Sequence, residues 1–380
     1  MQQTIKCLTA LLKSAVTGEE ISGNTGYKEQ FNSIIKLARA HEVSGIAAYA
    51  MIKSGLDNQT DSGIAEKEMF KASFNDTKNT YTYELAADLL SGAGIDFVPL
   101  KGFVIKNYYP ERFMRTSCDV DILVHKEDFD RAALTLENAG FTQVSDVRYH
   151  DVSLLYGNTN LELHFSVCED MSGADAYLEK IWDNVEAAGG RMYLETKDFF
   201  AFHHVAHMAH HFVCGGCGIR TFLDLWLLMR NNAFDPKVVR STCEKAKIGG
   251  FYDAAEKLTR VWFEDGEHDS LTLKMENYLL SGGAYGSRLT GTVAGTVKHG
   301  GKFRYIVSMA FPSYKGMKIL YPVLEKAPVL LPFCYVARAC EKAFYKKGAD
   351  ARRRIRDISG QDAGFIKETA SLLDELGLNL

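Results

Sequence analysis

The sequence has few of the features that mark a membrane or secreted protein. Its longest strongly apolar run, Pro328–Ala337, is too short to span a bilayer and is interrupted by Pro332. Residues 1–20 hold a broken apolar run without a small-residue cleavage site, which predicts an amphipathic helix rather than a secretory leader. The eight cysteines are irregularly spaced, as is typical of thiols that stay reduced. These absences predict a cytoplasmic protein without a membrane span.

Charge of either sign is not in large excess, but it is unevenly distributed. The 380 residues carry a formal net charge of −4, and 46% are hydrophobic, which is ordinary for a chain that buries a sizeable core. Residues 302–357, however, hold 13 Lys and Arg against 4 Asp and Glu, so the net charge of the remaining residues is near −13. This segment is either a solvated basic face or a patch that recruits nucleic acid, anionic lipid or an acidic acceptor.

Two aspartates near the middle of the chain give the clearest chemical signal. Asp119 and Asp121 flank Val120 and precede the apolar residues 122–124, a pattern that predicts a buried strand. Side chains at i and i+2 share one face of a strand, so both carboxylates point the same way. Such a pair suits a hard divalent cation, since Mg²⁺ is usually held by one or two carboxylates and substrate phosphates. The alternative is an exposed strand end where both carboxylates face water.

The residues before the aspartate pair predict an anion site. Phe97–Leu100 is a short buried strand that stops at Lys101-Gly102, and a helix-like stretch follows. A strand that ends at a glycine before a helix leaves backbone N–H groups free for an anion. Lys101 and Arg115 add cationic side chains of the kind that hold a triphosphate.

The residues after the pair predict a third carboxylate beside it. Ser153–Tyr156 and Leu161–Phe165 flank a polar turn and form the two arms of a hairpin. On the second arm Glu162 and His164 share one face, and the apolar side chains share the other. Glu162 therefore lies on a neighbouring strand, where a two-metal phosphoryl-transfer site requires a further acid.

Taken in order, these pieces resemble the uncharacterised bacterial nucleotidyltransferase family of the DNA polymerase beta superfamily. The resemblance rests on Leu-Lys-Gly (100–102), an Arg before Asp-x-Asp, and an acidic-Leu-His-aromatic strand (162–165). It continues through GIRTFLDLWLL (218–228), Phe-Pro-Ser (311–313) and Tyr335-x-x-Arg338, and so covers about residues 30–345.

The resemblance implies transfer of a nucleoside monophosphate from an NTP to an acceptor, with release of pyrophosphate. Asp119 and Asp121 would hold two Mg²⁺ or Mn²⁺ ions, and Glu162 would complete the metal site. The implied nucleotide-binding residues are Lys101, Gly102, Arg115, Ser117, His207, His211 and Arg220. The superfamily usually has Gly-Ser or Gly-Gly before the aspartates; here Phe103 follows Gly102, so Lys101, Arg115 and Ser117 are candidates for the role of that serine. The acceptor (sugar, small metabolite, protein or RNA), the choice of NTP and the oligomeric state are not predicted.

Two other functions stay open at this point. Because the Gly-Ser pair is missing, the chain could be an idle relative that binds a nucleotide or a partner without turnover. A second alternative is a zinc hydrolase, because five histidines lie between His203 and His211, and Cys214 and Cys217 follow. Arg220 and Asp224, four residues apart, are spaced for an ion pair on one helix. This pair is either an ordinary surface pair or, as the resemblance implies, one in which Asp224 orients Arg220 toward phosphate.

Periodicity and the resemblance together predict an α+β fold, a small mixed β-sheet nucleotidyltransferase core flanked by helices with a large C-terminal helical domain. The predicted parts are an N-terminal helical segment (1–95), the catalytic core (96–168), a helical domain read as nearly all helix (169–285) and a basic helical region (286–380). Within the core, a helix that begins at His125 and ends at Gly140 should turn Phe129, Ala133, Leu134 and Leu136 inward. The Gly-rich residues 281–301 predict a linker or a ligand-approaching loop.

Overall fold

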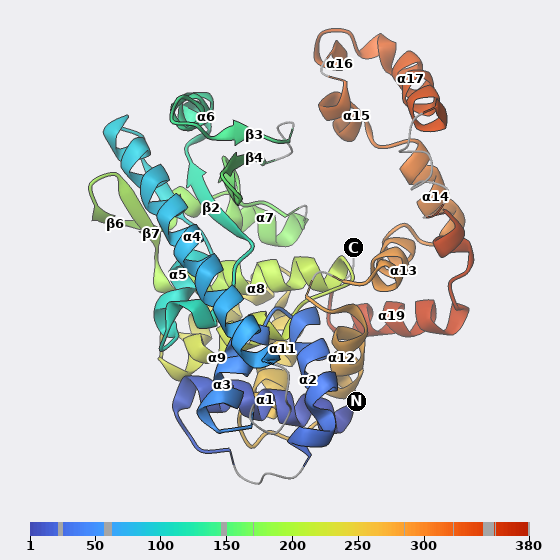
Figure 1. Ribbon diagram of the computed structural model, residues 1–380. Helices are drawn as coiled ribbons and strands as arrows, with labels where there is room; N and C mark the ends of the chain where they lie inside the picture. Colours follow the sequence, from blue (N-terminus) through green and yellow to red (C-terminus); the bar gives the residue numbers. More distant parts are fainter. Residues whose placement is uncertain are drawn as a thin grey trace.

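Seven strands form one mixed sheet in the order β3-β4-β5-β2-β1-β7-β6 (Figure 1). The computed structural model describes residues 1–21, 26–56, 63–145, 150–169, 171–284, 286–321, 323–344, 353 and 355–378. The strands are β1 (Phe97–Pro99), β2 (Asp119–Val124), β3 (Thr142–Gln143), β4 (Asp151–Tyr156), β5 (Thr159–His164), β6 (Val185–Gly189) and β7 (Met192–Glu195). Strand β2 runs parallel to β5 and antiparallel to β1. The expected α+β fold with a mixed sheet and a helical C-terminal region is confirmed.

Alternation along β2 and β5 gives the sheet two chemically different faces. Val120, Ile122, Leu161 and Leu163 are buried in one core together with side chains of α4 (Ile64–Gly92) and α6 (Phe129–Asn138). Leu123, on the opposite face of β2, belongs to a second core that is formed mainly by helices. Since Asp119 and Asp121 share parity with Leu123, the acids face this helical core.

The second core joins helices that precede the sheet in the sequence with helices that follow it. It combines α1 (Gln2–Thr17), α2 (Tyr27–Ala40) and α3 (Ser44–Lys53) with α8 (Lys197–Val213), α9 (Ile219–Arg230), α11 (Gly249–Phe263) and α12 (Ser270–Gly282). The other helices are α5 (Gly102–Ile105), α7 (Ser172–Leu178), α10 (Pro236–Lys245), α13 (Arg288–Lys298), α14 (Lys302–Ala310), α15 (Tyr314–Leu320), α16 (Val323–Lys326), α17 (Leu331–Phe344) and α19 (Ala363–Glu375). The predicted boundaries between the four parts stay a prediction.

Helices α14 to α17, residues 302–344, project from the rest of the molecule and are called the arm below (Figure 1). Within the arm, Met317, Leu324 and Cys334 form a small cluster of their own. No helix in the described part of the chain combines the length and apolarity needed to cross a bilayer.

Three local predictions were wrong. The stretch 169–285 also contains the β6–β7 hairpin, whose strand β7 pairs with β1 while β6 forms the edge of the sheet. This hairpin has no clear alternation, because β6 is largely exposed, so only its pairing with the sheet defines it. In α6 the buried stripe is Phe129, Ala132 and Leu136, while Leu134 is 57% exposed.

The third correction concerns the Gly-rich stretch 281–301, most of which is helical rather than a linker. Ser287 caps α13 by accepting a hydrogen bond from the Thr290 N–H at 3.1 Å, a start signal that the glycine content obscured. The glycines serve close packing: a Cβ on Gly215 would lie 2.5 Å from the backbone nitrogen of Gly291. Small residues here therefore bring α13 against the end of α8.

Candidate active site

Three carboxylates converge on the sheet face that meets the helical core. Asp121 on β2 is the register partner of Glu162 on the parallel strand β5, and Asp119 lies one pleat earlier on β2. His164 Nε2 lies 3.1 Å from Asp121 Oδ1 and 3.7 Å from Glu162 Oε2. Ligand atoms of Asp121, Glu162 and His164 all lie within 4.8 Å of one another, and within the described ranges no other group of three His, Cys, Asp or Glu side chains is so arranged.

The carboxylates titrate unequally because they are buried together. Burial, and then the charges of Asp121 and Glu162, raise the pKa of Asp119 to about 7. Burial and the charge of Asp121 also raise the pKa of Glu162. Burial acts the same way on Asp121, but the hydrogen bond from His164 and the charge of Lys101 outweigh it and hold the pKa of Asp121 well below its usual range. Oxygen donors that repel one another in a buried cluster fit a hard divalent cation.

All ten residues predicted for the site line one cavity of about 320 Å³. They are Lys101, Gly102, Arg115, Ser117, Asp119, Asp121, Glu162, His207, His211 and Arg220. Gly102 is needed for close approach, since a Cβ there would lie 3.0 Å from Ser117 Oγ and 3.1 Å from Arg115 Nη1. The Ser117 hydroxyl donates to the Asp119 carbonyl at 3.0 Å and so fixes the entry to β2.

Glu169, which the sequence did not single out, organises the cationic side of this cavity. Its carboxylate accepts a hydrogen bond from His207 Nδ1 at 2.7 Å and lies 3.7 Å from Lys101 Nζ and 3.5 Å from His210 Nε2. Burial opposes ionisation, but the His207 hydrogen bond and the charge of Lys101 outweigh it and hold the pKa of Glu169 well below its usual range. Glu169 follows β5 in a loop without periodic pattern, so no sequence signal identified it.

Lys101 is held in an uncommon backbone conformation, with φ of +41°. Burial lowers its pKa, but Glu169, Asp121 and the two other acids outweigh this effect and raise it, so the ammonium stays charged. Strained backbone at a non-glycine residue is a feature that clusters at functional sites.

The two arginines of the site have acidic partners other than those expected from spacing. Arg115 is buried and donates through Nε and Nη2 to Asp224 on α9, at 3.1 and 2.9 Å to Oδ2, while Tyr109 donates to the same carboxylate. Arg220 pairs with Glu42 and also donates from Nη1 to the Thr116 carbonyl at 3.1 Å. The expected Arg220–Asp224 pair is thus replaced, because Arg115 reaches Asp224 from the loop before β2.

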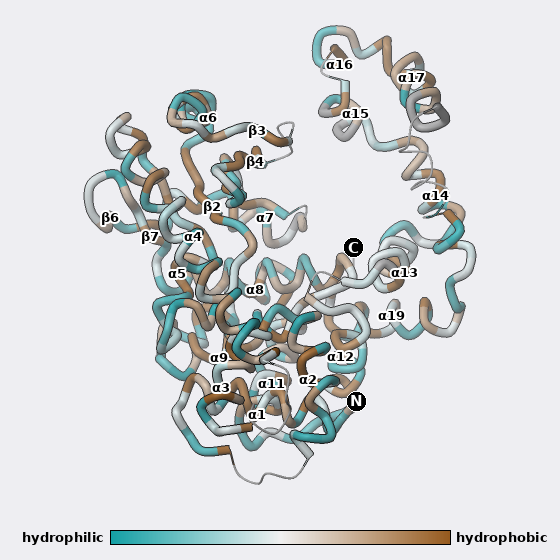
Figure 2. Tube along the Cα trace, viewed as in Figure 1, coloured by the Kyte–Doolittle hydropathy of each residue, from teal (hydrophilic) through white to brown (hydrophobic). Residues whose placement is uncertain are grey.

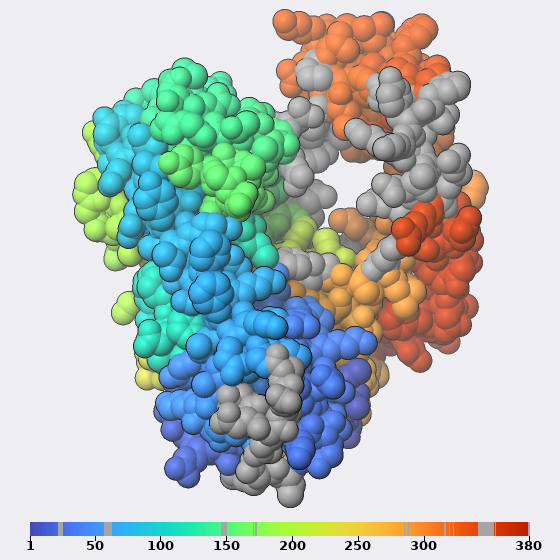
Figure 3. All heavy atoms as spheres, viewed as in Figure 1, coloured from blue at the N-terminus to red at the C-terminus, as the bar shows by residue number. Residues whose placement is uncertain are grey.

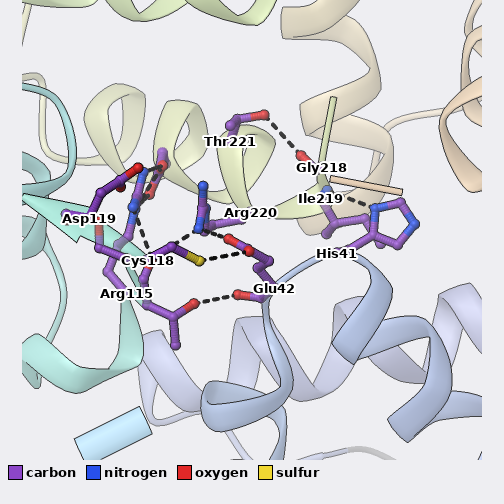
Figure 4. A network of polar contacts seen from close by, with 12 residues as sticks. His41, Glu42, Arg115, Cys118, Asp119, Gly218, Ile219, Arg220 and Thr221 are labelled. Atoms are coloured by element: carbon purple, nitrogen blue, oxygen red, sulfur yellow. Dashed lines mark hydrogen bonds and ion pairs between the residues drawn. The ribbon is translucent and has the colours of Figure 1, made fainter. Parts of the chain in front are cut away.

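Figure 4 shows how the corner between α2 and α3 holds the loop before β2 against the start of α9. Glu42 contacts Arg220 and accepts from Cys118 Sγ, and its carbonyl accepts from Thr116. Burial lowers the pKa of His41 to about 4, so the neutral ring accepts a hydrogen bond from the Ile219 N–H at 3.2 Å. These contacts fix where Asp119 enters the site.

Among the histidines of α8 and the two cysteines that follow it, His210 contacts Cys214, with 3.6 Å between Nε2 and Sγ, but this pair gains no third ligand of metal-site geometry within the described residues. His203 Nδ1 lies 3.0 Å from Glu195. His204 Nε2 donates a hydrogen bond to the Thr221 carbonyl at 3.0 Å, and the Cys217 thiol is hydrogen-bonded to the Thr221 hydroxyl. Within the described residues no His/Cys cluster of metal-site geometry forms here. The geometry therefore gives the zinc-hydrolase alternative no support, whereas His207 and His211 line the cavity and lie 3.0 Å apart through their Nε2 atoms.

A comparison with protein families shows which family the chain belongs to. A family model described as an uncharacterised nucleotidyltransferase matches residues 27–264, well over half of the chain. The chain belongs to this nucleotidyltransferase family. The matched range, from α2 to the end of α11, includes every residue of the cavity predicted from the sequence and excludes the arm. No curated protein matches the chain.

A second and larger cavity opens beside the carboxylates of this nucleotidyltransferase-family site. It measures about 670 Å³ and shares His150, Glu169 and His210 with the first. Its walls include Phe165 and Trp182 and the carboxylates of Asp175 and Glu179. A volume of this size suits a small molecule.

The raised pKa of Asp119 predicts how metal affinity depends on pH in this family member. Below about pH 7 a proton occupies Asp119, and a divalent ion must displace it, so affinity should rise with pH and level off above the pKa. Mn²⁺ titrations followed by electron paramagnetic resonance would measure this, and Asp119→Asn should lack the step near neutrality. A wild-type affinity that does not change between about pH 6 and 8 would contradict the prediction.

Proposed function

We propose that this protein transfers a nucleoside monophosphate from an NTP to a small-molecule acceptor in a reaction that depends on Mg²⁺. The observation that supports this proposal most is the convergence of Asp119, Asp121 and Glu162 from two adjacent parallel strands. Divalent ions held by these acids would neutralise charge on the triphosphate and on the attacking and leaving oxygens.

The side chains around the acids have separate roles in this proposal. The hydrogen bond from His164 orients Asp121, and Glu162, whose pKa is raised, takes the proton of the acceptor hydroxyl. Lys101 presents a charged ammonium to the triphosphate. Arg115 already donates to Asp224 and to the Thr116 carbonyl, so its contacts favour holding the loop before β2 in place.

The second cavity supplies the place for the acceptor. It adjoins the carboxylates through Glu169 and His150, and its volume accommodates a sugar or a comparable metabolite better than a folded RNA or protein surface. An acceptor bound there would lie beside Glu169 and His150, and its hydroxyl would approach the three acids past these two residues.

The test is incubation with each α-labelled NTP, Mg²⁺ and fractions of a cell extract. Label should move into a new product with the small-molecule filtrate, and addition of a chelator should abolish the transfer. Label entering only RNA or protein would contradict the proposed acceptor class. NTP binding by calorimetry without any labelled product would instead support an idle nucleotide-binding module.

A further inference from the structure

Helix α14 turns an apolar stripe toward solvent. Phe303, Val307 and Phe311 recur at i, i+4 and i+8, and all three are exposed, Phe303 to 78%. The opposite face holds the helix in place, because the Tyr305 ring stacks on His299 with centroids 5.0 Å apart. The amphipathic pattern is therefore inverted relative to a helix that buries its apolar side.

Helix α17 repeats this arrangement at the far end of the arm. Phe333, Val336, Ala337 and Cys340 follow the spacing i, i+3, i+4 and i+7, and every one is exposed. Its other face packs inward, where Cys334 is buried. Val329, in the turn before α17, is also exposed. Figure 2 shows such hydrophobic stretches along the arm, and Figure 3 shows the arm standing apart from the sheet across an open recess.

Cations accompany these apolar stripes. Arg304 follows Phe303, and Lys326 lies between Val323 and Val329; both cations are exposed and neither forms an ion pair within the described residues. Residues 302–344 hold seven Lys and Arg against two Asp and Glu, a surplus of five, so the net charge of the remaining residues is about −9. Protruding phenyl and aliphatic groups beside free cations are the composition of helices that lie in a membrane interface.

We propose that the arm, residues 302–344, binds the surface of an anionic lipid bilayer. Insertion of Phe303, Phe333 and Val329 among the acyl chains would remove exposed apolar area from water, and Arg304 and Lys326 would contact the lipid headgroups. The strongly negative remainder of the chain is repelled by the same surface, so the arm is the part that faces it. This inference is independent of the proposed chemistry.

Other occupants fit the arm less well. An RNA would be held by the cations and could stack on Phe303 and Phe333, but the exposed Val307, Val329 and Val336 between them offer bases no stacking surface. A second copy of the chain would supply negative charge, yet the projecting side chains would need a matching apolar groove. Both remain outcomes that the following experiment can distinguish.

The test is flotation of the full chain with vesicles of phosphatidylcholine alone and with phosphatidylglycerol added. Binding should require the anionic lipid and weaken as salt is raised. The double variant Phe303→Ser/Phe333→Ser should reduce partitioning at least about tenfold, because two phenyl groups no longer insert. The matched control is Phe70→Ser/Phe74→Ser, which removes two phenyl groups that are 71% and 59% exposed on α4 and should partition like the wild type.

Three results would overturn the proposal. They are absence of binding to the anionic vesicles, an equal loss in the α4 control, and light scattering that shows a dimer lost only in the arm variant. Binding of RNA in place of vesicles, abolished by the same arm variant, would assign the surface to nucleic acid instead. Thermal melts of both variants should match the wild type, since the replaced side chains are exposed.

Discussion

Asp121→Asn is expected to reduce nucleotidyl transfer by more than about a thousandfold while leaving the fold intact. Asp121 lies between Asp119 and Glu162, and it is the one of the three carboxylates whose pKa is lowered. It is therefore ionised at neutral pH and would supply negative charge to a bound metal ion. The neutral amide removes that charge with almost no change in volume. The metal-free protein should stay folded but lose some stability, because the substitution removes the favourable contacts of the Asp121 charge with His164 and Lys101. Initial rates with labelled NTP and a thermal melt measure the two effects.

The matched control for this variant is Asp130→Asn. Asp130 is exposed on α6, on the side of the sheet opposite the acids, and its loss should leave turnover unchanged. If Asp121→Asn kept wild-type turnover, the carboxylates would have no catalytic role.

Asp224→Ala is expected to lower the free energy of unfolding by roughly 3–5 kcal/mol, the largest stability effect predicted here. The substitution leaves the guanidinium of Arg115 buried without its carboxylate and also removes the acceptor of the Tyr109 hydroxyl. Urea unfolding followed by circular dichroism would measure the loss. The double variant Arg115→Met/Asp224→Leu should recover part of it, since neither charge then remains buried.

A surface pair gives the comparison for this effect. Asp253 pairs with Arg240 at 2.9 Å, as close as Asp224 to Arg115, but both side chains are about half exposed. Asp253→Ala should therefore cost less than about 1 kcal/mol. Equal losses for Asp224→Ala and Asp253→Ala would show that burial of the Arg115 pair has no special consequence.

The sequence predicted the acids because strand alternation is a local property. Asp119, Asp121, Glu162 and His164 share one face through a period of two, and the apolar residues between them bind the strands to α4 and α6. A reader of the sequence needs only the strands and their adjacency to place these carboxylates together.

The partners that organise the site could not be predicted in this way, because tertiary contacts alone bring them there. Glu42 reaches Arg220 over a separation of 178 residues, and Glu169 reaches His207 from an irregular loop. The same holds for Asp224. Its spacing from Arg220 favours an i, i+4 ion pair on one helix, but Asp224 pairs instead with Arg115, which is distant in the sequence. The β6–β7 hairpin was missed since its exposed strand has no buried face to create a period.

If both proposals hold, the protein works with its arm on an anionic surface and its carboxylates beside the second cavity. The arm lies outside the range matched by the family, so membrane contact and chemistry can be tested by separate variants of the same chain. Loss of vesicle binding in Phe303→Ser/Phe333→Ser should leave transfer to a water-soluble acceptor unchanged.

The most direct test of the central claim is to locate Mn²⁺ by anomalous diffraction in crystals grown with a non-hydrolysable NTP. Two peaks bridged by Asp119, Asp121 and Glu162, with the triphosphate extending toward Lys101, are the expected result. Peaks confined to the histidines of α8, or an absence of Mn²⁺ at the three acids while the nucleotide is bound, would contradict it.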